Sequence, residues 1–248
     1  MIRSNRHRGF DFRDVRALVL DDEDYNRVLT RDVMLRFGCA DVSEAVNGEE
    51  GIAALRQATR AFDLVVVDFR MPVMDGLRFL KEVRIGVPGV SRHMPIAMLT
   101  TYSDRFVVAT AFNLDVDCFL IKPVSAASMR ARLARVLSSD RPIRPPSDYD
   151  VIDIDPPPDP GAARARGFEP VAVHDGEIVR PPHAAPMPEL ARMVALDRVR
   201  PGAVLAGNLK TENGQILLRA GDILDAGTLA RLRDMAEFDE AVRSVVIA

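Results

Sequence analysis

The sequence predicts an α/β fold: a five-stranded, doubly wound parallel sheet followed by a small C-terminal α+β domain. From residue 16 to residue 138, short apolar runs alternate with longer amphipathic stretches, as strands and crossover helices do in parallel sheets. A proline-rich stretch then separates this pattern from a second patterned region. A chain of 248 residues has room for two domains, since domains typically hold about 100 to 150 residues.

The first domain is predicted over residues 15–138, after an N-terminal arm at 1–14. Its apolar runs are rich in Val, Leu and Ile and short enough for buried strands, at 16–20, 41–46, 63–67, 95–99 and 117–121. The amphipathic stretches between and after them predict helices at 25–37, 49–58, 76–84, 104–112 and 126–137. Five strand-helix units follow from this alternation.

Residues 139–189 are predicted to form a flexible linker. They contain 12 of the 17 prolines of the chain. Proline fixes its own backbone angle, lacks an N–H donor and restricts the residue before it, so this stretch favours an extended, solvated chain.

Residues 190–248 are predicted to form a small β-β-α-β output module. Strands at 204–210 and 215–219 flank Asn213-Gly214, a dipeptide typical of tight hairpin turns. Asp225 is a suitable helix cap, and residues 242–247 read as a last strand. A unit of about 55 residues is marginal alone, so we expect it to pack on a partner or to form a homodimer.

Composition excludes several classes of protein. The formal net charge of −3, from 33 basic and 36 acidic residues, makes nucleic acid an unlikely partner. The N-terminal arm precedes no apolar stretch long enough for a signal peptide or a membrane span, so we expect a cytoplasmic protein without a membrane partner. Cys39 and Cys118 read as core residues, and the four scattered histidines suggest no zinc site.

Polar side chains follow four of the five predicted strands. Asp21 and Asp22 follow the first, Asp68 the third, Thr100 the fourth and Lys122 the fifth. The carboxyl ends of parallel strands meet at one edge, where ligands bind in such sheets. Each feature alone has a structural explanation, such as a helix cap or a turn. Their joint occurrence in the right order favours a shared site.

The chemistry of these side chains suits phosphoryl transfer. Clustered carboxylates repel one another unless a cation such as Mg²⁺ lies between them, so we expect Mg²⁺ and no further cofactor. Asp68 ends the central strand of the predicted sheet and is the expected nucleophile, forming an acyl phosphate. Lys122 and Thr100 would donate to the phosphoryl oxygens.

Residues 15–138 resemble the receiver domain of bacterial response regulators, a CheY-like, flavodoxin-like fold. The resemblance is carried by Leu18-Val19-Leu20-Asp21-Asp22-Glu23, Val67-Asp68-Phe69-Arg70-Met71-Pro72-Val73-Met74-Asp75-Gly76, Met98-Leu99-Thr100 and Phe119-Leu120-Ile121-Lys122-Pro123. It implies that Asp68 is phosphorylated by a histidine kinase or phosphotransfer protein. It further implies that Asp22, Asp68 and the Arg70 carbonyl bind Mg²⁺, with Asp21 acting through water.

The same resemblance implies a switch pair, Thr100 and Phe119, in which the threonine moves toward the phosphoryl group and the ring turns inward. It places the readout face on the fourth helix, fifth strand and fifth helix. The candidate side chains there are Phe106, Phe112, Arg130, Arg132 and Arg135.

Two positions that tend to set the lifetime of the acyl phosphate in this family carry bulky residues. They are Arg70 and Tyr102, and they predict slow autodephosphorylation. Thr101 replaces the usual alanine or glycine and predicts narrower access to Asp68.

Residues 199–221 resemble the small module that accompanies HD-type phosphohydrolase proteins, but no histidine follows His183 to build a His-Asp metal site. One helix after a hairpin also lacks the successive helices of a helix-turn-helix. We therefore expect no enzyme beyond self-phosphorylation and dephosphorylation, and a module that engages an unknown downstream protein. The alternatives are a transcriptional regulator with an atypical DNA-binding module and a phosphorelay shuttle.

Overall fold

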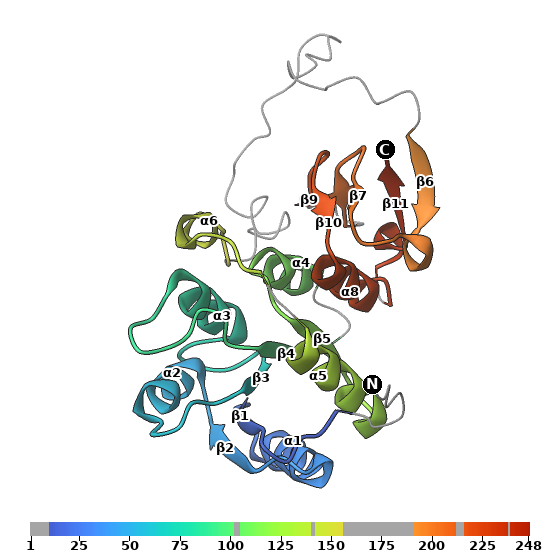
Figure 1. Cartoon of the computed structure of the whole chain (residues 1–248). Coiled ribbons are helices and arrows are strands. Elements are labelled where there is room, and N and C mark those ends of the chain that lie inside the picture. Colours follow the sequence, from blue (N-terminus) through green and yellow to red (C-terminus); the bar gives the residue numbers. More distant parts are fainter. Residues whose placement is uncertain (1–9, 102–104, 140–141, 156–190, 212–215, 238) are drawn as a thin grey trace, which may run out of the picture.

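The computed structural model describes residues 10–101, 105–139, 142–155, 191–211, 216–237 and 239–248. The predicted five-stranded parallel sheet is confirmed, with strand order β2-β1-β3-β4-β5 (Figure 1). Its strands are β1 (Arg16–Leu20), β2 (Asp41–Ala45), β3 (Leu64–Asp68), β4 (Ile96–Thr101) and β5 (Cys118–Lys122). Strands β3, β4 and β5 extend past the predicted ends, because the parallel ladder continues through Asp68 and Lys122.

Helices cover both faces of the sheet. The elements are α1 (Asp24–Phe37), α2 (Gly48–Gln57), α3 (Gly76–Ile85), α4 (Arg105–Asn113) and α5 (Ala126–Ser138). Alternate residues of β3 face opposite layers: Leu64 and Val66 pack with side chains of α1 and α5, whereas Val65 and Val67 pack with those of α2, α3 and α4. The strands are therefore buried on both sides, which explains their continuous apolar sequences.

Arg84 of α3 is fully buried and ties the helix to the loops at the amino-terminal edge of the sheet. Its guanidinium pairs with the Asp117 carboxylate at 2.9 Å. It also donates to the backbone carbonyls of Arg92, Met94 and Asp115 at 2.7 to 3.3 Å. A buried charge is tolerated because these partners replace the water that it loses.

The segment after α5 differs from the expected flexible linker over residues 142–155. It contains the short helix α6 (Pro146–Asp150), and Tyr149 is fully buried. The Tyr149 hydroxyl donates to Asp115 at 2.7 Å, and Lys81 of α3 donates to the carbonyls of Asp150 and Ile152. Tertiary contacts with α3 and the α4–β5 loop thus fold a segment that its prolines alone do not. Residues 156–190 lie outside the described part of the chain.

The C-terminal module contains more and shorter strands than the expected β-β-α-β unit. Its elements are β6 (Arg192–Ala195), η1 (Leu196–Arg198), β7 (Ala203–Val204), β8 (Leu209–Lys210), β9 (Ile216–Leu218), β10 (Ile223–Leu224), α8 (Ala226–Met235), η2 (Glu240–Val242) and β11 (Ser244–Ile247). Antiparallel pairs join β6 to β11, β7 to β10 and β8 to β9. The predicted strand at 204–210 is split because β7 and β8 pair with different partners. The predicted turn at Asn213-Gly214 lies outside the described residues.

Helix α8 begins at the predicted cap, where the Asp225 side chain accepts from the Thr228 N–H at 2.6 Å. It packs against β5 and lies beside α4 (Figure 1). The apolar core of the module is continuous with the core of the first domain on this side. No helix within the described ranges is both long and apolar enough to cross a membrane.

We expect Arg84→Met to lower the free energy of unfolding by about 3–5 kcal/mol, because Asp117 and three carbonyls would stay buried without their donor. Urea denaturation measures this loss. Arg78→Met, an exposed arginine on the same helix, should change stability by less than about 0.5 kcal/mol. Equal effects of the two substitutions would contradict the structural role given to Arg84.

Candidate functional site

The carboxyl ends of three parallel strands bring the principal charged residues together. Asp68 is the last residue of β3, Lys122 is the last residue of β5, and Asp21 follows β1 directly. Strand β1 lies on one side of β3, and β4 separates β3 from β5. The predicted convergence of these side chains at one edge is present in the structure.

The Lys122 ammonium lies between the two carboxylates. Its Nζ is 3.0 Å from Asp21 Oδ2, and it also donates to Asp68 Oδ1. Asp21 is 1% exposed and Asp68 is 8% exposed, so neither carboxylate has full access to water. Lys122 therefore supplies the positive charge that two neighbouring buried carboxylates need.

Backbone amides complete the hydrogen bonding of both carboxylates. The Arg70 N–H donates to Asp68 Oδ2 at 2.8 Å, and the Glu23 N–H donates to Asp21 Oδ1 at 3.0 Å. The loops after β3 and β1 thus fix each side chain from outside the sheet. The Lys122–Pro123 peptide bond is cis.

Gly76 allows α3 to begin against the end of β3. A Cβ at this position would lie 2.5 Å from the Asp68 carbonyl oxygen. This oxygen belongs to the backbone, so it cannot move aside as the end of a flexible side chain could. The Gly76 N–H donates to the Phe69 carbonyl at 2.9 Å. Sequence reasoning gave Gly76 no role of its own, although the Asp75-Gly76 pair at the start of a helix is a recognisable signal.

Burial and the neighbouring charges both shift the pKa values of Asp68 and Lys122. Burial raises the pKa of Asp68 above its ordinary value, and the nearby Asp21 carboxylate adds to the increase, while Lys122 opposes it. Burial alone would lower the pKa of Lys122, but its bonds to Asp68 and Asp21 raise it overall. Lys122 therefore keeps its positive charge at neutral pH.

The remaining predicted site residues occupy different environments. Thr100 in β4 is 3% exposed and directly follows Leu99, the residue that pairs with Asp68 in the sheet. Phe119 in β5 is fully buried. Asp22 is exposed to solvent. Tyr102 lies outside the described residues, as do the side chains of Thr101 and Phe106.

The oxygen donors partly match the predicted magnesium site. Among the residues that the structure describes, no three His, Cys, Asp or Glu side chains are grouped closely enough to hold a metal ion. Asp21 and Asp68 do form a close pair around a cation, the Lys122 ammonium. Since Mg²⁺ is commonly held by one or two carboxylates with water and phosphate oxygens, this pair fits its preferences.

Comparisons with known proteins match the first half of the chain. The family model described as the response regulator receiver domain matches residues 17–134. The protein named Probable chemotaxis protein CheY from Rhizobium etli is 31% identical over 50% of this chain and 94% of its own length. Two-component response regulator ORR41 of Oryza sativa is 34% identical over 49% of this chain and 93% of its own.

A solved structure, the chemotaxis response regulator CheY4 of Vibrio cholerae, is 28% identical with a TM-score of 0.43. The match covers 50% of this chain and 98% of the CheY4 chain. The predicted resemblance of residues 199–221 to a module of HD-type phosphohydrolase proteins is not shown by these matches.

We expect the stability of the protein to depend on pH through Asp68. Because the folded state raises the pKa of Asp68, it binds the proton more tightly than the unfolded chain does. The resulting stability is fully present below the ordinary pKa of 3.8 and is lost as pH rises through the raised value. The free energy of unfolding of the wild type, relative to Asp68→Asn, should therefore fall as pH rises above 3.8. Chemical denaturation at a series of pH values measures this difference.

Glu49→Gln is the matched control, because Glu49 is exposed on α2. The stability difference between the wild type and this variant should stay nearly constant over the same pH range. A constant difference for Asp68→Asn would contradict the raised pKa.

Proposed function

Because this chain belongs to the two-component response regulators that carry a receiver domain, we propose that Asp68 accepts a phosphoryl group from a histidine kinase or phosphotransfer protein. The observation that carries the proposal is the Asp68 carboxylate at the end of β3, held beside Asp21 and Lys122. Phosphorylation then switches the protein interactions of a C-terminal module that is not an enzyme.

In the proposed reaction an Asp68 carboxylate oxygen attacks the phosphorus of a phosphohistidine. The new O–P bond forms as the N–P bond breaks, and the electron pair of that bond goes to the imidazole nitrogen. Lys122 has the role of pairing with the phosphoryl oxygens, since its ammonium already contacts the nucleophile. Thr100 would supply a hydroxyl donor from the neighbouring strand.

Magnesium is part of this proposal. The Asp21 and Asp68 carboxylates, the neighbouring Asp22 carboxylate and the Arg70 carbonyl are the groups that would hold the ion. When bound, Mg²⁺ would neutralise charge between the carboxylates and the incoming phosphoryl oxygens. The Arg70 N–H, by donating to Asp68 Oδ2, fixes the carboxylate orientation from the protein side.

Thr100 and Phe119 are the proposed switch pair. Thr100 is buried in β4 and Phe119 in β5, on adjacent strands that are paired in register. The Phe119 carbonyl accepts from Arg132 of α5 at 3.0 Å. A movement of Phe119 would therefore reach α5 directly.

We expect a small acyl phosphate donor such as acetyl phosphate, with Mg²⁺, to add one phosphoryl group to the wild type. Asp68→Asn should not be labelled, because the amide is not a nucleophile toward phosphorus. Intact-protein mass spectrometry measures the addition, and Glu49→Gln should be labelled as the wild type is. Full labelling of Asp68→Asn would place the phosphoryl group elsewhere.

We expect Lys122→Ala to slow phosphorylation of Asp68 by about 10²–10³-fold, since it removes one fixed donor to the phosphoryl oxygens. The initial rate of labelling by the same donor measures this effect. Lys81→Ala removes an ammonium on α3 and is the matched control, for which we expect an unchanged rate. A wild-type rate in Lys122→Ala would remove Lys122 from the mechanism.

A further inference from the structure

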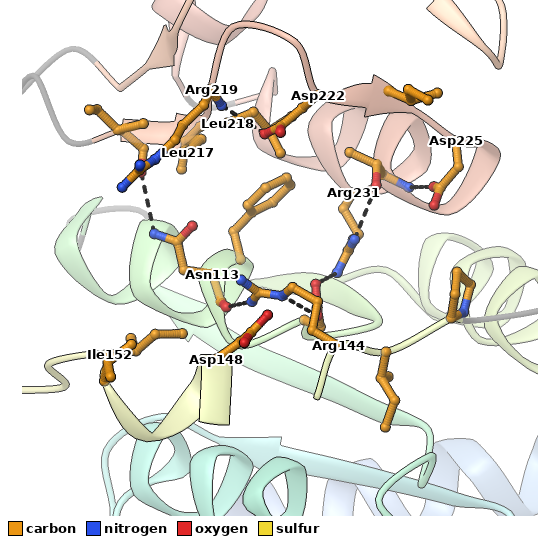
Figure 2. A pocket seen from close by; sticks show the side chains of 18 of the residues that line it. Asn113, Arg144, Asp148, Ile152, Leu217, Leu218, Arg219, Asp222, Asp225 and Arg231 are labelled. Carbon is orange, nitrogen blue, oxygen red and sulfur yellow. Dashed lines mark hydrogen bonds and ion pairs between the residues drawn. The ribbon is translucent and has the colours of Figure 1, made fainter. Parts of the chain in front are cut away.

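A groove lies between the segment at 142–155, which follows α5, and the β9–β10 part of the C-terminal module (Figure 2). Phe112 and Asn113, at the end of α4, line it between these two walls. The groove has a volume of about 1190 Å³. Small-molecule sites typically have volumes of roughly 300–1,000 Å³, so this groove is large enough for several residues of a peptide chain.

One buried carboxylate, that of Asp115 in the α4–β5 loop, holds both sides of the groove. Its Oδ2 lies 3.0 Å from Arg144 Nε and 2.7 Å from the Tyr149 hydroxyl, both in the segment at 142–155. Its Oδ1 lies 2.7 Å from Arg231 of the module. Because both sides are bound to the same group, the groove is formed before any partner arrives, which lowers the cost of binding.

The lining of this groove carries a net negative charge. Six aspartates and three arginines line it, so its formal charge is −3. The aspartates are Asp115, Asp148, Asp153, Asp155, Asp222 and Asp225, and we call the cavity that they line the acidic groove. The whole chain of 248 residues also has a net charge of −3. The groove therefore concentrates negative charge and favours a basic partner.

Five of these carboxylates are available to a partner. Asp115 is already paired with Arg144 and Arg231, but within the described ranges none of the other five forms an ion pair. Asp222 is half-buried and the remaining four are exposed. Figure 2 shows Asp148 on one wall and Asp222 on the opposite wall, so a basic segment in the groove would meet carboxylates on both sides.

Exposed apolar side chains also lie on both walls. Val151 is 81% exposed on the segment at 142–155, and on the module Ile223 is 66% and Ile216 is 40% exposed. Single exposed apolar residues are common in folded proteins, but several that gather in one polar-rimmed hollow mark an interaction site. A segment that fits this groove therefore carries apolar as well as basic side chains.

We propose that the acidic groove binds a basic segment of a partner protein. Arginine side chains of that segment pair with the exposed aspartates, and its apolar side chains pack on Val151, Ile216 and Ile223. Arginine suits the groove because its planar guanidinium can donate two hydrogen bonds to one carboxylate. The inference goes beyond the proposed function, since none of the residues that line the groove belongs to the Asp68 site and binding needs no phosphoryl group.

A fluorescein-labelled peptide of alternating arginine and leucine is the probe for this proposal. Fluorescence anisotropy with the full, unphosphorylated chain measures its Kd. We expect binding that weakens as the salt concentration rises, because salt screens exposed charges. A peptide with glutamate in place of arginine should not bind. Equal binding of the two peptides, or no binding of the arginine peptide, would overturn the proposal.

Asp148→Asn combined with Asp155→Asn tests the charges of the groove. Both side chains are exposed, so their replacement should leave the fold intact. The Kd of the arginine peptide should rise at least about 5-fold, as expected from the loss of two surface ion pairs. Glu49→Gln combined with Asp197→Asn removes two exposed carboxylates outside the groove and should match the wild type. Equal Kd values for the two double variants would contradict a site at the groove.

Ile223→Ala tests the apolar contact, and its matched control is Leu35→Ala, an exposed leucine on α1. The Kd of the arginine peptide should rise at least about 5-fold in Ile223→Ala, because apolar area buried on binding is lost. It should not change in Leu35→Ala. An unchanged Kd in Ile223→Ala would show attraction by charge alone and would overturn the proposed packing.

Two other occupants of the groove give different results. If the chain's own arginines occupied it, Arg164→Ala combined with Arg166→Ala would bind the peptide more tightly than the wild type does. If a second copy occupied it, the wild type would sediment as a dimer and Ile223→Ala as a monomer. Either result would overturn the assignment to a partner protein. Labelling of Asp68 by acetyl phosphate is measured separately, so failure of one proposal leaves the other standing.

Discussion

The contact of the Lys122 ammonium with two buried carboxylates is the interaction on which the carboxyl-terminal edge of the sheet depends. Asp21 and Asp68 come from strands β1 and β3, which are neighbours, and their charges repel at short range. Lys122 reaches them from β5, across β4, and makes this pair of charges tolerable inside the protein. The same contact holds the Asp68 carboxylate in position beside a cation, as the proposed phosphoryl transfer requires.

Strand β5 has a further role that follows from its place at the edge of the sheet. One side of the strand pairs with β4, and the other has no strand beside it within the described chain. Helix α8 packs there, so the strand that carries Lys122 also supports the C-terminal module. The site and the C-terminal module therefore share a structural element, which the proposed switch requires, since a modification can shift only a conformation that it contacts differently.

Charge is distributed between the two parts of the chain in a complementary way. The receiver contributes Arg132 and Arg135, and the module contributes the buried Asp234. At Asp115 the signs are reversed, because the receiver contributes the carboxylate and the module contributes Arg231. Such paired contacts define the orientation of α8 more strictly than apolar packing alone.

The sequence by itself determined the parallel sheet and the strand-end residues, because buried parallel strands leave continuous apolar runs and polar residues follow them directly. It did not determine that Tyr149 would fold part of the proline-rich segment, or that residues 204–210 would divide between two strand pairs. Nothing in the sequence pairs Arg231 or Asp234 with residues of the first domain. Only the tertiary structure showed that they pair with the receiver, since their partners lie about a hundred residues away along the chain.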